Sequence, residues 1–209
     1  MLGAMTDPVR YRPPVPPVFL GVIALCVAVQ LLSEAAPASR EWLLLHGALW
    51  PQLFEGVRPM FPGQQVIMFL TYGFLHGGLL HLGMNMLALY VLARSLAVAM
   101  PGGAMVALYA LAQLVAGAVQ LWLSDSQLPV VGASGAIFGL AGAEIAIAAR
   151  ILLARGGSLR PLGGPVAQFI LLNVALTLAV PNIAWQAHLG GALAGVAIGA
   201  LYRPRRGRR

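Results

Sequence analysis

Six long apolar segments constrain the fold of this chain more than any other feature. A helix needs about 20 apolar residues to cross about 30 Å of hydrocarbon. Most of the segments are separated by Pro, Gly, Ser, Asp or Asn residues, which favour turns or end helices. The segments cover residues 18–36, 70–99, 104–123, 134–150, 162–180 and 183–202. The sequence therefore predicts an all-α membrane protein with six transmembrane helices.

Composition supports the same class. The chain has 209 residues, of which 59% are hydrophobic and only 9% are charged, and its mean hydropathy of +0.83 lies outside the range of soluble globular domains. The net charge of +7 comes with 13 basic residues, all of them Arg. These are spread along the chain as membrane topology would place them, so nucleic-acid binding is not expected.

The arginines also predict an orientation in the membrane. Six helices place both termini on the same side as the loops that follow the second and fourth helices. Eleven of the 13 arginines fall on that side, and only Arg40 and Arg58 fall on the other. The positive-inside rule then assigns residues 1–17 and the Arg-rich residues 203–209 to cytoplasmic tails of a cell-membrane protein. Residues 37–69 become a long first loop in the outer interface.

The first apolar segment has a second interpretation. Arg10 and Arg12 precede it and Ala36-Pro37-Ala38 follows it, an arrangement that also fits a cleavable signal peptide. The segment spans 19 residues, which is longer than a usual signal core and long enough to cross a bilayer. We therefore expect a retained transmembrane helix.

Polar residues gather near the starts of three predicted helices. The second, fourth and sixth helices all run inward from the outer face, so their first turns should lie at similar depth. Ionisable and polar groups in membrane helices usually face the protein interior. We therefore expect one pocket beneath the outer surface, formed by His76, His81, Asn85, Ser134 and His188.

These residue types fit acyl-transfer chemistry. Ser134 is a candidate nucleophile and His188 a candidate general base. His81 and Asn85 are four residues apart and share a helix face, so both could donate hydrogen bonds to a developing oxyanion. The glycines around Ser134 permit close approach of a carbonyl group, and the helix start adds backbone N–H groups.

No carboxylate completes a triad in this arrangement. Asp125 falls in an outer loop, and Glu144 follows Ser134 by ten residues, about 15 Å along a helix. A Ser–His dyad is therefore the predicted site. The alternative is that Ser134 caps a helix and His188 is a buried structural residue in a binding scaffold or a transporter.

The motifs resemble those of the rhomboid intramembrane serine proteases. The match rests on Gly132-Ala133-Ser134-Gly135 opening the fourth helix, on His188 opening a glycine-rich sixth helix, and on His81 and Asn85 within residues 76–85. The resemblance implies a six-helix rhomboid-like bundle and a Ser134–His188 dyad. It also implies an oxyanion site from His81, Asn85 and the Ser134 backbone, with Gly132 and Gly135 in support, and no cofactor or metal. The implied partners are the lipid bilayer and transmembrane protein substrates, which are cleaved near the outer face.

Some positions depart from the family pattern. Phe138 stands where the family often has an aromatic ring, commonly Tyr, packed on the catalytic imidazole. Ile67 and Met68 stand where a Trp-Arg pair is common, and residues 96–99 lack a Glu often found there. The alternative function is a catalytically inactive relative that binds transmembrane clients. The natural substrate and the oligomeric state stay open.

Overall fold

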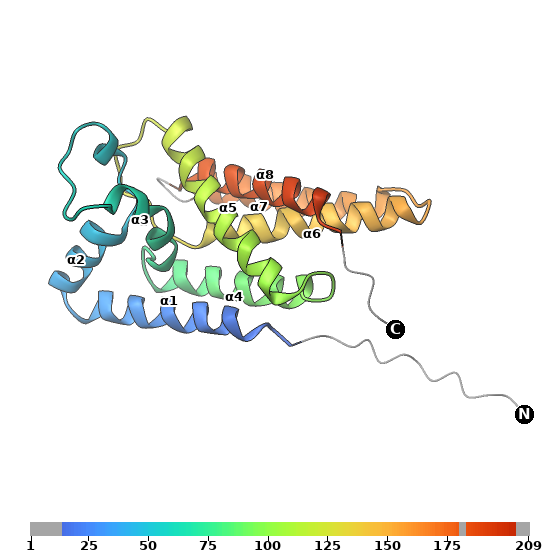
Figure 1. The fold of residues 1–209 in the computed structure, drawn as a ribbon, viewed down its shortest axis with the longest axis horizontal. Helices are drawn as coiled ribbons and strands as arrows, with labels where there is room; N and C mark the ends of the chain where they lie inside the picture. Colours follow the sequence, from blue (N-terminus) through green and yellow to red (C-terminus); the bar gives the residue numbers. More distant parts are fainter. Residues whose placement is uncertain (1–13, 180–182, 204–209) are drawn as a thin grey trace, which may run out of the picture.

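A computed structural model describes residues 14–179 and 183–203, and that part of the chain forms eight α-helices (Figure 1). They are α1 (Pro17–Ala35), α2 (Pro37–Gly47), α3 (Gln64–Thr71), α4 (Leu79–Leu96), α5 (Gly102–Leu123), α6 (Ser134–Ala154), α7 (Gly163–Ala179) and α8 (Trp185–Leu201). Three short 3₁₀ helices, η1 (Pro51–Phe54), η2 (Tyr72–Phe74) and η3 (Arg160–Leu162), join them. Most of both predicted cytoplasmic tails lies outside the described residues, as do residue 180 at the end of the fifth predicted span and residues 181 and 182 after it.

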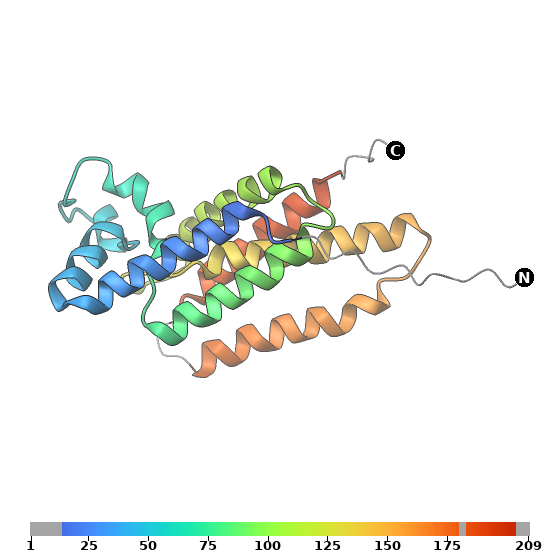
Figure 2. The same cartoon turned by 90° about the horizontal axis from the view of Figure 1, so that it is seen from below.

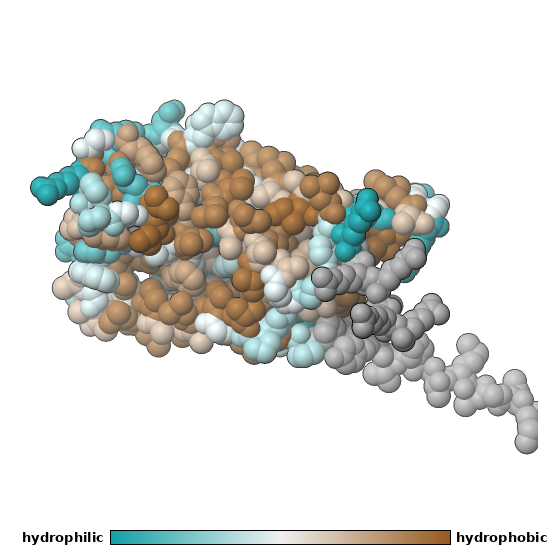
Figure 3. All heavy atoms as spheres, viewed as in Figure 1, coloured by the Kyte–Doolittle hydropathy of each residue, from teal (hydrophilic) through white to brown (hydrophobic). Residues whose placement is uncertain are grey.

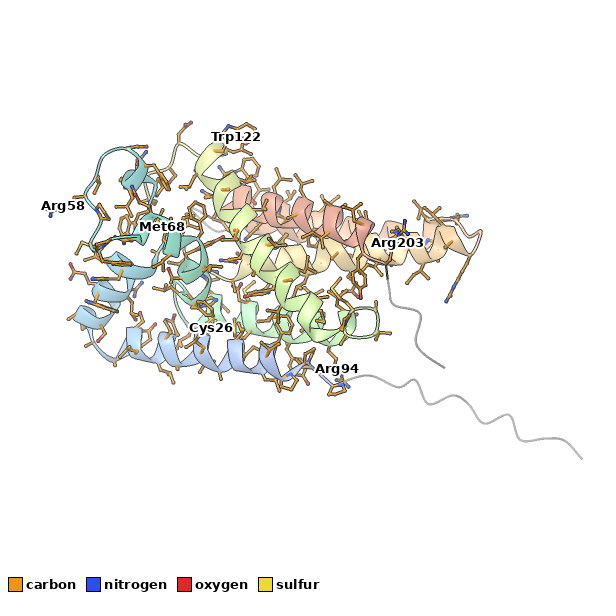
Figure 4. The ribbon with its side chains drawn as sticks, viewed as in Figure 1. Cys26, Arg58, Met68, Arg94, Trp122 and Arg203 are labelled. Carbon is orange, nitrogen blue, oxygen red and sulfur yellow. The ribbon has the colours of Figure 1, made fainter. Side chains whose placement is uncertain are left out.

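Four of these helices, α1, α4, α5 and α6, are long and apolar enough to cross a membrane. Helices α7 and α8 have 17 residues each and are slightly shorter. Apolar residues cover the middle of the face shown in Figure 3, and hydrophilic residues gather toward its two ends. Arg94 and Arg203 lie at one end of the molecule and Arg58 at the other (Figure 4).

The second predicted helix differs most from the structure. The apolar pattern predicts a start at residue 70, but α4 starts at Leu79. Gly78 precedes it with φ +142°, a backbone conformation that a helix cannot contain. Residues 64–71 form the separate helix α3. The long first loop is therefore largely helical, because it contains α2, η1 and α3.

Helix α6 lies at the centre of the bundle and packs against α4, α5 and α8. The colours in Figure 1 show that α4, α6 and α8 run in the same direction, so their first turns lie toward the same end. An apolar core fills the space between α1, α4, α5 and α6, and its fully buried members include Phe19, Leu89, Met105 and Leu140. This packing fixes the positions of the helix starts that carry the polar residues.

Glycines bring α6 and α8 into backbone contact. A Cβ at Gly195 would lie 2.8 Å from the Cα of Gly139, and a Cβ at Gly199 would lie 2.7 Å from the carbonyl oxygen of Ala143. Gly191 faces the Gly135 carbonyl in the same way. Small residues at four-residue spacing let membrane helices approach this closely. The start of α8 is thereby held against the start of α6.

Backbone hydrogen bonds also fix the segment that leads into α6. Leu49 and Val130 exchange two N–H···O bonds, of 3.0 and 2.9 Å. The Gly132 N–H donates to the Tyr72 carbonyl oxygen at 2.8 Å. Tyr72 is itself buried and its hydroxyl donates to the Gln113 carbonyl oxygen on α5. The residues just before Ser134 are therefore held from two sides.

Candidate active site

Ser134 and His188 are in direct contact. Ser134 is the first residue of α6, and His188 lies in the first turns of α8 with only 4% of its surface exposed. The Ser134 Oγ and the His188 Nε2 are 2.8 Å apart, within hydrogen-bond distance. The close packing of α6 on α8 brings together two residues that are 54 positions apart in the sequence.

The other ring nitrogen of His188 has a partner that the sequence pattern did not indicate. His188 Nδ1 lies 2.9 Å from the carboxamide oxygen of Asn173 on α7. Because that oxygen can only accept, Nδ1 carries the proton and donates it. The unprotonated Nε2 then accepts a hydrogen bond from the Ser134 hydroxyl. From the sequence, a third member of the site was expected only among carboxylates, whereas the side chain that contacts His188 Nδ1 is an amide.

An aromatic ring covers one face of the imidazole. Phe138 stacks on His188 with ring centroids 4.3 Å apart and an interplanar angle of 6°. Phe138 lies one turn after Ser134 on α6, so the same helix holds the serine and the ring beneath the histidine. Phe169 of α7 packs on Phe138, with ring centroids 4.8 Å apart. Rotation of the imidazole is thus restricted by packing and by two hydrogen bonds.

The His81 ring lies close to Gly132, near the Ser134 hydroxyl. A Cβ built at Gly132 would lie 3.1 Å from His81 Nε2 and 3.7 Å from Ser134 Oγ. The absence of a side chain there leaves a small space between the histidine and the hydroxyl. The Gly77 N–H donates to His81 Nδ1 at 3.1 Å, so the proton of the neutral ring is on Nε2. That Nε2–H therefore faces the space beside Ser134.

Asn85 and His76 both contact His81. Asn85 is buried, and its amide donates to the His81 carbonyl oxygen at 2.9 Å, one turn earlier on α4. His76 packs edge-to-face on His81, with ring centroids 5.2 Å apart. It lines a separate cavity of about 30 Å³ that also contacts Gln30 and Arg40. The contacts of His76 are therefore with His81 and with the lining of this cavity.

Two buried glutamines on α5 support both helix starts, and the sequence pattern did not single them out. Gln113 Oε1 accepts a hydrogen bond from the Ala136 N–H, and Gln120 Oε1 accepts one from the Ala187 N–H, each at 3.2 Å. First-turn N–H groups have no acceptor within their own helix. The sequence did contain a sign of this role, because two glutamines seven residues apart lie on one face of an otherwise apolar helix.

Glu144 takes part in a different contact from this pair. Glu144 accepts a hydrogen bond from Ser95 of α4, so it links α6 to α4 further along the bundle. Within residues 14–179 and 183–203, no group of three or more His, Cys, Asp or Glu side chains is arranged to hold a metal ion.

Comparison with known proteins places these observations in a family. The four span-like helices and the apolar surface are those of a multi-pass membrane protein. The sequence model of the Rhomboid domain family matches residues 63–205, which include every candidate site residue. The chain therefore belongs to the rhomboid family.

Two relatives illustrate the similarity. The Rhomboid protease GluP of Bacillus subtilis (strain 168) is 35% identical over 139 residues, which cover 66% of this chain and 26% of that protein. Rhomboid-related protein 3 of Homo sapiens is 28% identical over 158 residues, covering 66% of this chain and 36% of the relative. The chain thus spans about a third or less of the length of these relatives.

Proposed function

We propose that this chain is an intramembrane serine endopeptidase that cleaves transmembrane segments of membrane proteins near the outer face. The observation that carries the proposal is the 2.8 Å contact between Ser134 Oγ and His188 Nε2. Membership of a family that contains a relative named as a protease supports it at the level of the family. Nothing in the geometry specifically favours an inactive client-binding protein.

In the first half of the reaction, Ser134 Oγ attacks the carbonyl carbon of the scissile peptide bond. Its proton passes to His188 Nε2. The carbonyl oxygen becomes an oxyanion in the space beside Gly132, where the His81 Nε2–H and the Ser134 backbone N–H can stabilise it. The C–N bond then breaks, and the imidazolium gives its proton to the leaving amine. The product is an acyl-enzyme on Ser134.

In the second half, a water molecule must reach the acyl-enzyme from the outer face. His188 Nε2 takes a proton from this water while the water oxygen attacks the acyl carbon. The C–O bond to Ser134 then breaks, and the serine recovers its proton from the imidazolium. A scissile bond inside a helix is covered by neighbouring turns, so we expect substrates with helix-breaking or small residues at the cleavage site to react faster.

We propose that α1 and α4 to α8 are the six membrane spans, with α2 and α3 in the outer interface. The first turns of α4, α6 and α8 then lie near the outer face, which places the Ser134 and His188 pair close to water. The positive-inside rule assigns the end that carries Arg94 and Arg203 to the cytoplasm.

Covalent labelling tests the chemistry directly. The wild-type protein in detergent is treated with a fluorophosphonate, and the modified residue is found by mass spectrometry. Because the base activates only one serine, we expect an adduct on Ser134 that is lost in Ser134→Ala and strongly reduced in His188→Ala. Ser95→Ala, which changes a serine on α4 away from the pair, is the control and should label like the wild type. Labelling that persists unchanged in His188→Ala would contradict the proposal.

A further inference from the structure

Helix α7 supplies one polar side chain to His188. Asn173 is half-buried in an otherwise mainly apolar helix, and its Oδ1 lies 2.9 Å from His188 Nδ1. A carboxamide inside a membrane helix is costly unless it finds a hydrogen-bond partner. Here the partner is the candidate base itself, which is 15 residues away in the sequence.

The same face of α7 also supports the imidazole through an aromatic contact. Phe169 precedes Asn173 by four residues, so the two side chains share one face of the helix. Phe169 packs on Phe138, and Phe138 stacks on His188. Figure 2 shows α7 at the periphery of the bundle, and among the elements it packs against are α8 and η3. Asn173 and Phe169 therefore lie on the face of α7 that is turned toward His188.

We propose that Asn173 is a positioning residue that completes a Ser134–His188–Asn173 triad; this inference rests on the proposed function. By accepting the Nδ1 proton, the carboxamide selects the tautomer whose Nε2 can accept the Ser134 proton. It also fixes the plane of the ring, so that Nε2 points at the hydroxyl. A hydrogen bond to the Nδ1–H of a catalytic histidine performs both tasks in serine hydrolases.

A neutral amide differs from a carboxylate in this position. It orients the ring without placing a negative charge in the apolar interior, where an unpaired carboxylate is expensive. It also gives less stabilisation to the imidazolium that forms during each proton transfer. Asparagine thus favours orientation over charge stabilisation, and replacing it by aspartate should separate the two effects.

Steady-state kinetics in proteoliposomes test the proposal with a model transmembrane substrate. Asn173→Leu keeps the side-chain size and removes the acceptor, so we expect kcat to fall by at least about tenfold, since general-base catalysis contributes about 10² to 10⁴. KM should stay within about twofold, because Asn173 is proposed to act through His188 and not to bind the substrate. Asn173→Asp should retain activity, with the acid limb of its pH profile moved to higher pH. Gln168→Leu, which removes an exposed carboxamide from the same helix, is the control and should match the wild type.

A spectroscopic readout separates positioning from a loss of folding. The ¹⁵N spectrum of histidine-labelled protein should show an Nδ1-protonated signal that is absent in His188→Gln, and Asn173→Leu should shift it toward a tautomeric mixture. An unchanged signal together with wild-type kcat in Asn173→Leu would overturn the positioning role and leave the Ser134 chemistry standing. An inactive wild type with unlabelled Ser134 would instead remove the proposed function and this inference with it.

Discussion

At the scale of single residues, the proposed reaction depends on Gly132 as well as on the groups proposed to react. Its φ of +130° is a conformation that residues with a Cβ rarely adopt. Its missing side chain leaves the space between His81 and Ser134 in which the oxyanion is proposed to form. A methyl group there would occupy the position that the carbonyl oxygen needs.

Gly132→Ala should therefore abolish cleavage and labelling of Ser134. Gly63→Ala is the matched control, because Gly63 also has a positive φ, of 85°, but a Cβ added there would have no heavy atom of another part of the chain within 4 Å. Each change adds backbone strain on the order of 1–3 kcal/mol, and only the first fills the proposed site. The measurement is the rate of fluorophosphonate labelling at equal amounts of folded protein. Equal rates in the two variants would show that the space beside Gly132 is not used.

The residues of the site were predictable to different degrees. Ser134 and His188 stand out because each is a polar residue at the start of an apolar segment, and motif and topology point to the same pair. Asn173 was not predicted, because its partner becomes evident only when α7 is packed beside α8. His76 was grouped with His81 by depth alone, and the structure places its ring against His81 and beside a cavity lined by Gln30 and Arg40.

At the scale of elements, the contact between α6 and α8 determines the geometry of the Ser134 and His188 pair. Gly195→Ala would place a methyl group against the Gly139 backbone, with its Cβ 2.8 Å from the Gly139 Cα. Since backbone cannot move aside like a flexible side chain, we expect a loss of stability of about 1–3 kcal/mol, as for overpacked cores. Activity should fall as well, because separating the helices lengthens the serine–histidine contact.

Gly83→Ala on α4 is the control for helical propensity. Nothing lies within 4 Å of an added Cβ at Gly83, so this change should leave stability equal or raise it by about 0.5–1 kcal/mol. Unfolding by dodecyl sulfate in mixed micelles measures both variants. Equal midpoints for Gly195→Ala and Gly83→Ala would be inconsistent with close backbone packing of α6 on α8.

The hydrophobic pattern predicted some helix boundaries and missed others. The apolar segments gave the start of α6 at Ser134, where Gly132 and the preceding turn chemistry mark the boundary. They did not separate α3 from α4, because residues 64–96 are apolar on both sides of the Gly77–Gly78 break. The helices α2 and η1 were hidden in a segment expected to be an interfacial loop.

At the scale of the whole molecule, the proposed arrangement in the membrane predicts which loops face the cytoplasm. Asp125 should face the outside and Ser158, in the turn between α6 and η3, should face the cytoplasm. Cysteines introduced as Asp125→Cys and Ser158→Cys test this with a membrane-impermeant thiol reagent. In intact cells only the first should react, and the second should require permeabilisation. Cys26 is fully buried, so the wild type is the unlabelled control. The reverse pattern would invert the topology.

Cleavage of a single-span substrate in proteoliposomes tests the proposed protease most directly. Wild-type protein should produce two fragments whose masses place the cut within the transmembrane segment, near the end that faces the start of α6. Ser134→Ala and His188→Ala should each remove cleavage, and Ser95→Ala should preserve it. Cleavage at the wild-type rate by Ser134→Ala, or substrate bound but never cut by the wild type, would contradict an intramembrane serine protease.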